Sequence, residues 1–193
     1  MILSDRDIFK KVDSWELVIT SPNKNWRDQI HASSMDMRLW KYFKIYKHSK
    51  VAILDPKNMD WTEDLVELIE VKDWESFIVQ PWEFVLAVTE EKVKIPNDVV
   101  ARVEWRSSIW RLWIIIHTTA GFIDAGFEWT ITLEICNLNR MPVALYPWQR
   151  VCQLAFEQMT SPAIVPYWEK KCSKYQNQVL PEESRVMIDP EFV

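Results

Sequence analysis

Short apolar runs recur along the chain, and proline, aspartate, asparagine and tryptophan separate them. Runs of this length and spacing are typical of the short strands of an all-β sandwich or barrel. A chain of 193 residues is long enough for one well-buried domain and short for two. We therefore predict one mainly-β domain with short helices over residues 1–193. The runs that predict its strands lie at 77–79, 84–88, 99–103, 130–136, 143–145 and 151–156.

The first residues predict a short helix over positions 4–12. Ser4 is a suitable N-cap, because its hydroxyl can accept a hydrogen bond from a free backbone N–H of the first turn. Asp7 follows three residues later, as in a capping box. The acidic stretch 60–75 is compatible with a short helical insertion or a solvated loop, and we favour the loop.

The run 130–136 alternates between apolar and polar positions. Period-two alternation places Ile131, Leu133 and Ile135 on one face of a strand. Thr132 and Glu134 then share the opposite face. On the pattern alone, Glu134 is a solvent-exposed carboxylate on a half-buried strand. A carboxylate at the edge of a ligand site could instead accept and donate a proton.

Two arginines and two serines lie close together just before this strand. Arg106 and Arg111 are five residues apart and flank Ser107 and Ser108. Guanidinium groups and small hydroxyls are suited to the oxygens of a phosphate chain. The same residues could also form a structural salt-bridge network beside a loop, and the pattern leaves both interpretations open.

Glycine and tryptophan have unusual frequencies in this chain. Only 2 glycines occur, where an average composition of about 7% predicts about 13 or 14, while 12 tryptophans are present. Trp82 and Trp148 follow proline and Trp74 follows aspartate, as glycine often does in turns. Trp40 ends a strand-like run, and Trp129 directly precedes the strand that carries Glu134.

We therefore hypothesise that the tryptophans stand for glycines. A UGA codon that some bacteria read as glycine, translated as tryptophan, would produce this pattern. The alternative is a genuine tryptophan-rich surface that binds sugars or membrane interfaces.

Charge and cysteine content narrow the function classes. The formal net charge is −5, which disfavours non-specific binding to nucleic acid polymers. The longest apolar run, around 112–116, is too short to cross a bilayer. The residues from Met1 onward do not have the charged and then apolar pattern of a leader. We therefore expect a cytoplasmic protein without membrane contact. Cys136, Cys152 and Cys172 fit reduced thiols. They form no zinc-binding pattern with the three histidines, so we expect no zinc.

The segment 106–134, RSSIWRLWIIIHTTAGFIDAGFEWTITLE, resembles the core motifs of the dCTP deaminase family within the trimeric dUTPase-like superfamily. The resemblance extends from MILSDRDI at the start to SKYQNQ near the end, with tryptophan where the family has glycine. It implies a distorted jelly-roll, or β-clip, of the dUTPase-like barrel type. It also implies a homotrimer whose nucleotide sites lie at subunit interfaces.

The resemblance assigns catalytic roles to Glu134, Ser107 and Arg111. Glu134 matches the proton-shuttling glutamate, while Ser107 and Arg111 would lie near the reacting base and its water. Arg106 and Ser108 would bind the triphosphate with Ser107. Asp124 would bond the deoxyribose 3′-hydroxyl. The complete set implied for nucleotide binding is Arg106, Ser107, Ser108, Arg111, Ala120, Asp124, Thr132, Leu133, Glu134, Gln153, Tyr167, Lys174 and Gln178.

Two outlying parts of the chain also match the family. Asp36 resembles an aspartate that helps to position hydrated Mg²⁺ or the phosphate chain, so the resemblance implies Mg²⁺ carried by the nucleotide and no metal held directly by the protein. A strand-edge carboxylate is the plain alternative for Asp36. The C-terminal segment, about 165–193, would close over the nucleotide. His117 is expected to pack beside the site rather than to act as a catalyst.

The reaction product depends on the run AGFID, in which Ala120 and Gly121 resemble dUMP-forming relatives. The expected activity is therefore deamination of dCTP followed by hydrolysis to dUMP and diphosphate, on the path to dTTP precursors. Three alternatives remain open: a deaminase that stops at dUTP, a plain dUTP pyrophosphatase, and a non-catalytic tryptophan-rich β-sandwich that binds a sugar, lipid or protein surface.

Overall fold

Strand β3 (Ser34–Tyr46) lies at the centre of the fold in a computed structural model that describes residues 1–47, 53–57, 65–117 and 120–191. The other strands are β1 (Val18–Thr20), β2 (Ile30–His31), β4 (Val66–Glu70), β5 (Phe77–Val79), β6 (Phe84–Thr89), β7 (Lys92–Lys94), β8 (Val99–Trp105), β9 (Ile114–Ile115), β10 (Phe122–Ile123), β11 (Glu128–Trp129), β12 (Thr132–Asn137), β13 (Val143–Leu145) and β14 (Arg150–Gln158). The helical elements are α1 (Asp5–Asp13), α2 (Ser107–Trp110), η1 (Trp26–Gln29) and η2 (Val186–Ile188).

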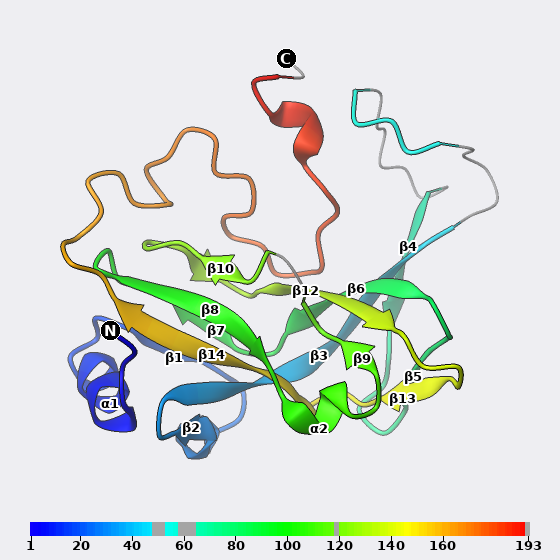
Figure 1. The fold of residues 1–193 in the computed structure, drawn as a ribbon, viewed down its shortest axis with the longest axis horizontal. Helices are drawn as coiled ribbons and strands as arrows, with labels where there is room; N and C mark the ends of the chain where they lie inside the picture. Colours follow the sequence, from blue (N-terminus) through cyan, green and yellow to red (C-terminus); the bar gives the residue numbers. More distant parts are fainter. Residues whose placement is uncertain (48–52, 58–64, 118–119, 192–193) are drawn as a thin grey trace.

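The large sheet has the strand order β10-β8-β14-β3-β6-β12-β9, and β2 and β4 also pair with β3. Its neighbouring strands are antiparallel. Two smaller sheets, β1-β7-β11 and β13-β5, complete the architecture. Strands β8 and β10 share one cavity with β6 and β12, although β14 and β3 separate them in the sheet. The sheet is therefore curled, and the segment after β14 runs above β10 and β12 (Figure 1).

The core lies inside the curl and is built largely by β3 and β14. Met35, Met37 and Leu39 alternate along β3 and are fully buried, as is Phe156 of β14. Phe43 stacks on Phe77 with ring centroids 4.2 Å apart. Burying side chains of this size stabilises a fold by about 1.5–3 kcal/mol each, so the two long strands fix the frame on which the shorter ones pair.

Most predicted elements are present. The mainly-β class is confirmed, and the strands predicted at 77–79 and 143–145 have those bounds as β5 and β13. The helix predicted at 4–12 is α1, and the Ser4 side chain accepts a hydrogen bond from the Asp7 backbone N–H as its N-cap. None of the helices in the described residues is long and apolar enough to cross a membrane.

Two local expectations were wrong. Trp40 does not end its strand, because β3 continues to Tyr46 while paired with β6 and β4. The register against β6 shifts between Leu39 and Phe43, so the irregularity at Trp40 is a break in register within the strand. The stretch 60–75 is not a loop throughout, since Val66–Glu70 forms β4. Residues 60–64 of that stretch lie outside the described residues.

Several tryptophans have a backbone conformation that glycine normally adopts. The φ angle is 60° at Trp15, 64° at Trp82, 62° at Trp113, 116° at Trp129 and 69° at Trp148. Among the described residues, the only other non-glycine residue with positive φ is Asn177. Trp82 and Trp148, which follow proline, thus have the glycine-like backbone that the sequence predicts for these turns. Trp74, which follows aspartate, has no positive φ.

Candidate active site

Strand β12 directs Glu134 towards a cavity. Leu133 and Ile135 are fully buried in the core, as the alternation predicts. Thr132 and Glu134 point to the other face, where the Glu134 side chain is 34% exposed. The backbone of β12 is fixed by β6 along five residue pairs. The carboxylate therefore has a rigid support and remains accessible to a ligand.

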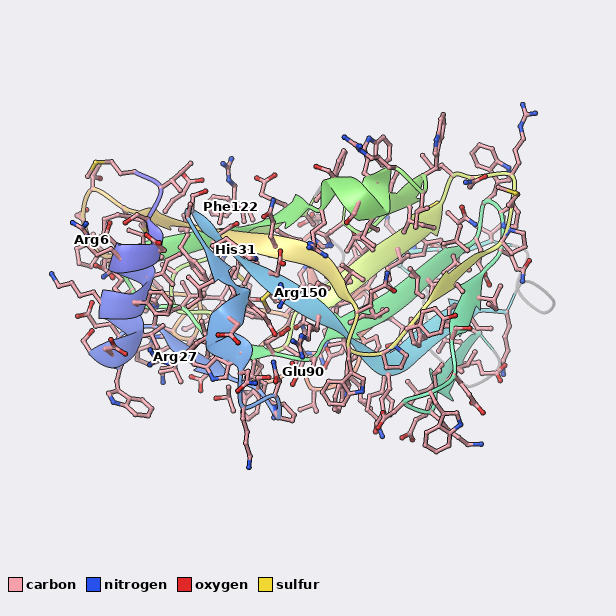
Figure 2. All side chains as sticks on the ribbon, turned by 90° about the horizontal axis from the view of Figure 1, so that it is seen from below. Arg6, Arg27, His31, Glu90, Phe122 and Arg150 are labelled. Atoms are coloured by element: carbon pink, nitrogen blue, oxygen red, sulfur yellow. The ribbon has the colours of Figure 1, made fainter. Side chains whose placement is uncertain are left out.

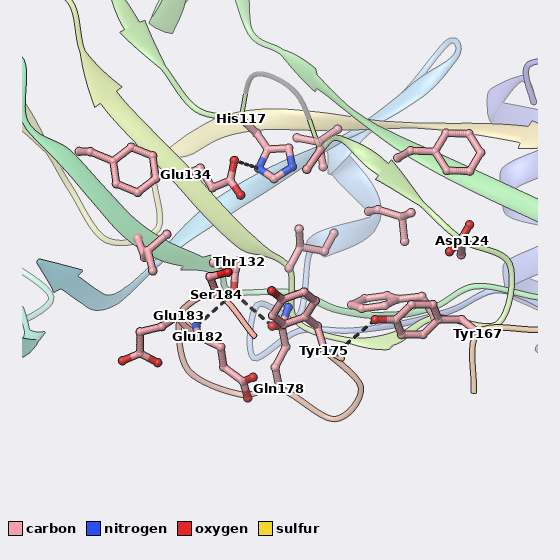
Figure 3. A pocket seen from close by; sticks show the side chains of 18 of the residues that line it. His117, Asp124, Thr132, Glu134, Tyr167, Tyr175, Gln178, Glu182, Glu183 and Ser184 are labelled. Carbon is pink, nitrogen blue, oxygen red and sulfur yellow. Dashed lines mark hydrogen bonds and ion pairs between the residues drawn. The ribbon is translucent and has the colours of Figure 1, made fainter. Parts of the chain in front are cut away.

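The cavity beside Glu134 has a volume of about 400 Å³ and is shown in Figure 3. This size is within the usual range for small-molecule sites. Strands β8 and β10 form one wall, β6 and β12 form another, and the C-terminal segment closes a third side. The lining residues that the sequence also predicted are Ala120, Asp124, Thr132, Glu134, Tyr167 and Gln178.

His117 lies against the catalytic candidate. Its ring is buried, and Nδ1 is 3.9 Å from the Glu134 Oε2 atom. Within the described part of the chain, Nδ1 has no hydrogen-bond partner. The indole of Trp105 donates a hydrogen bond to the backbone carbonyl of His117 at 2.9 Å. His117 thus limits the space open to the Glu134 carboxylate; Thr118 and Thr119, which follow it, lie outside the described residues.

Gln178 fastens the C-terminal segment to the start of β12. Its side chain donates to the Thr130 carbonyl at 2.6 Å and accepts from the Thr132 hydroxyl at 3.2 Å. The Thr130 hydroxyl in turn donates to the Gln178 carbonyl at 2.7 Å. Tyr167 accepts a hydrogen bond from the Tyr175 backbone N–H at 3.1 Å. The predicted contacts Tyr167 and Gln178 therefore lie at the cavity.

Lys174 and Leu133 do not line the cavity with them. Lys174 forms an ion pair with Asp189 at 2.5 Å, and this hydrogen bond raises the pKa of the Lys174 ammonium group above its ordinary value. The side chain of Leu133 is part of the core, so only its backbone can face a nucleotide. Gly121 lies beside the cavity, where an added Cβ would come within 3.0 Å of the Val103 carbonyl oxygen.

Of the predicted arginine and serine residues, Arg106 belongs to a second group, which surrounds Asp36. Arg106 is the N-cap residue of α2, and its Nε is 3.1 Å from Asp36 Oδ1. Arg150 and His31 contact Asp36 Oδ2 at 3.3 and 3.1 Å. The Asp36 side chain is only 4% exposed. Figure 2 shows His31 and Arg150 near one another in the view from below.

The neighbours of this second group are also hydrogen-bonded. Gln153 accepts from the Ser34 hydroxyl at 2.9 Å and donates to the Trp105 carbonyl at 3.2 Å. Sequence reasoning missed Arg150 and His31, because no local spacing along the chain connects either residue with Asp36. Their spacing from Asp36 becomes visible only when β2, β3 and β14 pair.

The two groups do not meet in one cavity of a single chain. Arg106, Ser107, Ser108, Arg111 and Gln153 are absent from the cavity lining. The lining carries carboxylates of Asp124, Glu134, Glu182 and Glu183 but no lysine or arginine among the described residues. An anionic ligand would therefore need cations from outside this cavity. Strand β8 lines the cavity through Val103, but α2 begins beyond the end of that strand, and none of its residues belongs to the lining.

The acidic wall residues were not predicted. Glu182, Glu183 and Ser184 line the cavity from the C-terminal segment, and Tyr46 lines it from β3. Burial, with the negative charges of Glu183 and Glu134, raises the pKa of the Tyr46 phenol above its ordinary value. In a polar C-terminal sequence, no local pattern distinguishes these glutamates from solvated ones.

Metal-binding side chains are not clustered in the part of the chain that the structure describes. No group of three or more histidine, cysteine, aspartate or glutamate side chains is placed to hold a metal ion there. Cys136, Cys152 and Cys172 are free thiols. Cys152 is completely buried, and burial raises the pKa of its thiol well above the ordinary range.

The fold and the cavity define a class: a curled, mainly-β protein with a cavity of small-molecule size that is lined by a strand-borne carboxylate. A profile of dCTP deaminase-like proteins matches residues 2–159. The chain is 50% identical over 192 residues to "dCTP deaminase, dUMP-forming" of Methanobrevibacter smithii, covering 99% of this chain and 98% of that protein. It is 49% identical to the protein of the same name from Dictyoglomus thermophilum, covering 98% and 96%.

A solved structure agrees with the fold. The crystal structure of 2′-deoxycytidine 5′-triphosphate deaminase from Agrobacterium tumefaciens matches with a TM-score of 0.61 and 20% identity, over 80% of this chain and 46% of that one. This chain belongs to the dCTP deaminase-like family. The predicted mainly-β fold and the predicted family are confirmed.

Proposed function

We propose that this chain deaminates dCTP without zinc and hydrolyses the product onward to dUMP and diphosphate. The observation that carries the proposal is the position of Glu134, held by a rigid strand in a cavity of nucleoside size. The relatives that are 49–50% identical over nearly the full chain bear the name of this bifunctional activity. The pyrimidine and sugar would occupy the cavity, with Asp124 at the 3′-hydroxyl.

Glu134 would move the protons of the deamination step. Its carboxylate accepts a proton from water as the water oxygen adds to C4 of the cytosine ring, and it passes that proton to N3. It then takes the proton of the new C4 hydroxyl and delivers it to the amine, which leaves as ammonia while the C4 carbonyl forms. One carboxylate within reach of all these atoms is sufficient for this sequence. His117 would keep the carboxylate in place.

The acidic lining supports a site shared between copies of the chain. Four carboxylate residues line the cavity, and although Glu182 and Glu183 are paired with Arg185 and Lys44, no lysine or arginine of the described residues is in the lining itself. A triphosphate would therefore be stabilised by cations that approach from outside. Arg106, Ser107, Ser108 and Arg111 form the basic segment that suits this role. We therefore propose a homotrimer in which this segment of one copy completes the cavity of the next, with Gln153 nearby, as closed cyclic symmetry allows.

Mg²⁺ would arrive with the nucleotide. Both Asp36 oxygens already form ion pairs with arginines, Arg106 and Arg150, and Oδ2 also contacts His31, so this aspartate fits a role in positioning the arginines better than direct ligation. The ion would offset the charge of the phosphate chain. Gly121 lets the backbone next to Ala120 pack closely on Val103, because an added Cβ would come within 3.0 Å of the Val103 carbonyl oxygen; the resemblance of the run AGFID to dUMP-forming relatives supports a role for Ala120 and Gly121 in hydrolysis to dUMP. A substrate found in nucleotide pools also favours a cytoplasmic location.

Product analysis tests the activity. The chain is purified with glycine restored at the twelve tryptophan positions and incubated with dCTP and Mg²⁺, and ammonia, diphosphate and nucleotides are measured, the nucleotides by anion-exchange chromatography. We expect dUMP with one ammonia and one diphosphate per dCTP consumed. Accumulated dUTP without diphosphate would support the deaminase-only alternative. Cleavage of added dUTP without any ammonia from dCTP would indicate a plain pyrophosphatase, and no turnover would favour a binding protein.

Glu134→Gln separates binding from catalysis. The amide keeps the shape of the side chain but cannot accept the proton, so ammonia release should fall by about 10²–10⁴-fold, while calorimetry should still show dCTP binding. Glu128→Gln is the matched control, because Glu128 pairs with Lys94 on the surface at 3.0 Å. Undiminished turnover in Glu134→Gln would contradict the assignment.

A further inference from the structure

Lys44 and Glu134 lie in one cross-strand row. Lys44 of β3 is opposite Leu86 of β6, and Leu86 is opposite Glu134 of β12. Directly opposed residues of antiparallel strands point to the same face of the sheet. Because β6 lies between their strands, the backbones of Lys44 and Glu134 are two strand spacings apart, or roughly 10 Å. A lysine that no family motif identified thus shares the face that carries the catalytic candidate.

The ammonium group of Lys44 is held by the C-terminal segment. Its Nζ atom is 2.7 Å from Glu183 Oε1, and the two side chains are only 17% and 16% exposed. A partly buried ion pair is screened little by salt, and removal of one partner leaves the other poorly solvated. The pair therefore constrains the chain around Glu183 more strongly than a surface pair would.

Glu183 belongs to the part of the C-terminal segment that forms a wall of the cavity. Glu182, Glu183 and Ser184 all line it, as Figure 3 shows. The Glu182 backbone N–H also donates to the Thr132 hydroxyl at 3.4 Å. Gln178 fastens the same segment further upstream. The Lys44 contact is thus a second anchor of this segment, at Glu183, in addition to the one at Gln178.

We propose that the Lys44–Glu183 ion pair holds this wall in place, which makes Lys44 a positioning residue for the nucleotide. The proposal rests on the proposed function. The wall contacts ligand only when it is anchored, so the loss of the pair weakens nucleotide binding. The proton transfers by Glu134 do not involve Lys44, so turnover of bound substrate is preserved.

Steady-state kinetics tests the role. Lys44→Met and Glu183→Gln should each raise the KM for dCTP by about tenfold, equivalent to about 1.4 kcal/mol, with kcat almost unchanged. The charge swap Lys44→Glu with Glu183→Lys should restore most of the lost affinity, because it re-forms the pair. Lys41→Met is the matched control, since Lys41 lies on the same strand and pairs with Glu70 away from the cavity. An unchanged KM in both single variants, or a swap without rescue, would overturn the proposal.

Hydrogen–deuterium exchange gives a second readout that does not depend on turnover. In Lys44→Met and Glu183→Gln, amides of residues 174–185 should exchange faster than in the parent chain, whereas Lys41→Met should leave them unchanged. Equal exchange in all variants would refute the anchor even if KM rises. A chain that shows the exchange effect but never releases ammonia from dCTP would contradict the proposed function and not the anchor.

A separate observation concerns the tryptophans. Five of them have positive φ, a region where a bulky L-residue is strained and glycine is not. The residues Trp15, Trp82 and Trp113 are 79%, 70% and 60% exposed, so burial of the indole offsets little of that strain. Trp105 and Trp110 crowd the basic segment, with ring centroids 5.1 Å apart.

We infer that the protein made in its own cells carries glycine at the tryptophan positions, through a codon that these cells read as glycine. Intact mass spectrometry of the protein purified from the source cells tests this. The expected mass is lower than that of the 193-residue chain by twelve tryptophan-to-glycine differences, and peptide mapping should show glycine at position 82. A mass that matches twelve tryptophans would overturn the inference.

Discussion

At the scale of single residues, Glu91 is the most unusual acid in the described chain. It is fully buried, and burial with the nearby charge of Glu90 raises its pKa from 4.5 to about 8. Its Oε1 accepts a hydrogen bond from the Gln29 amide at 2.6 Å, and its Oε2 accepts from the Arg38 backbone N–H at 2.9 Å. The folded protein therefore holds a proton on Glu91 at neutral pH that the unfolded chain releases.

This difference predicts that stability falls with increasing pH. Between pH 4.5 and about 8 the folded state binds one more proton at Glu91 than the unfolded state, so the free energy of unfolding decreases by up to about 1.4 kcal/mol per pH unit. Glu91→Gln removes this titration and should flatten the profile. Urea unfolding at pH 5, 6, 7 and 8 measures the slope. The control variant Glu75→Gln, on the surface, should leave this slope unchanged. An unaltered slope in Glu91→Gln would show that Glu91 is ionised in the folded state.

A comparison of Trp82 with Trp74 measures how much a left-handed backbone conformation at tryptophan lowers the free energy of unfolding. Both are exposed, at 70% and 78%, but only Trp82 has positive φ. Trp82→Gly should raise the free energy of unfolding by about 1 kcal/mol, because the strain of about 1–3 kcal/mol outweighs the greater freedom of glycine when unfolded. Trp74→Gly should lower it by about 0.5 kcal/mol. Chemical denaturation measures both, and equal effects would indicate that Trp82 is not strained.

At the scale of elements, the sequence predicts best where one face of a strand is buried. Strand β12 alternates between core and cavity, so its period of two identifies both the strand and the direction of Glu134. The helix α1 is similarly local, since Ser4 and Asp7 cap it within one turn. In these elements the residues that decide the structure are neighbours in sequence.

The elements that were missed depend on distant pairing. Strand β4 is acidic and gives no local signal, yet it forms because its residues pair with Tyr42–Tyr46 of β3. The extension of β3 beyond Trp40 likewise depends on β6 and β4. The contribution of Glu183 to the cavity was hidden for the same reason, because its partner Lys44 is 139 residues away. Contacts of this separation follow from topology and not from local pattern.

At the scale of the whole molecule, the separation of the basic segment from the acidic cavity becomes a prediction about assembly. The family resemblance places Arg111 and Glu134 in one site, whereas one folded chain keeps Arg111 out of the cavity lining. If neighbouring copies exchange these groups, a cavity needs Glu134 from one copy and Arg111 from another. Two inactive variants can then complement each other.

Mixed assemblies of Glu134→Gln and Arg111→Ala test this arrangement. Each variant alone should be nearly inactive. Co-expressed in equal amounts, random mixing around a closed ring should leave about one quarter of the sites with both native residues, and ammonia release should recover to about that share of the parent activity. The control mixes Glu134→Gln with a Glu134→Gln, Arg111→Ala double variant, which leaves no site complete. Failure to recover, although size-exclusion chromatography shows mixed oligomers, would mean that Arg111 and Glu134 act within the same chain. Because the cavity's own described residues supply only negative charge, that outcome would also require the basic segment to move towards the nucleotide on binding.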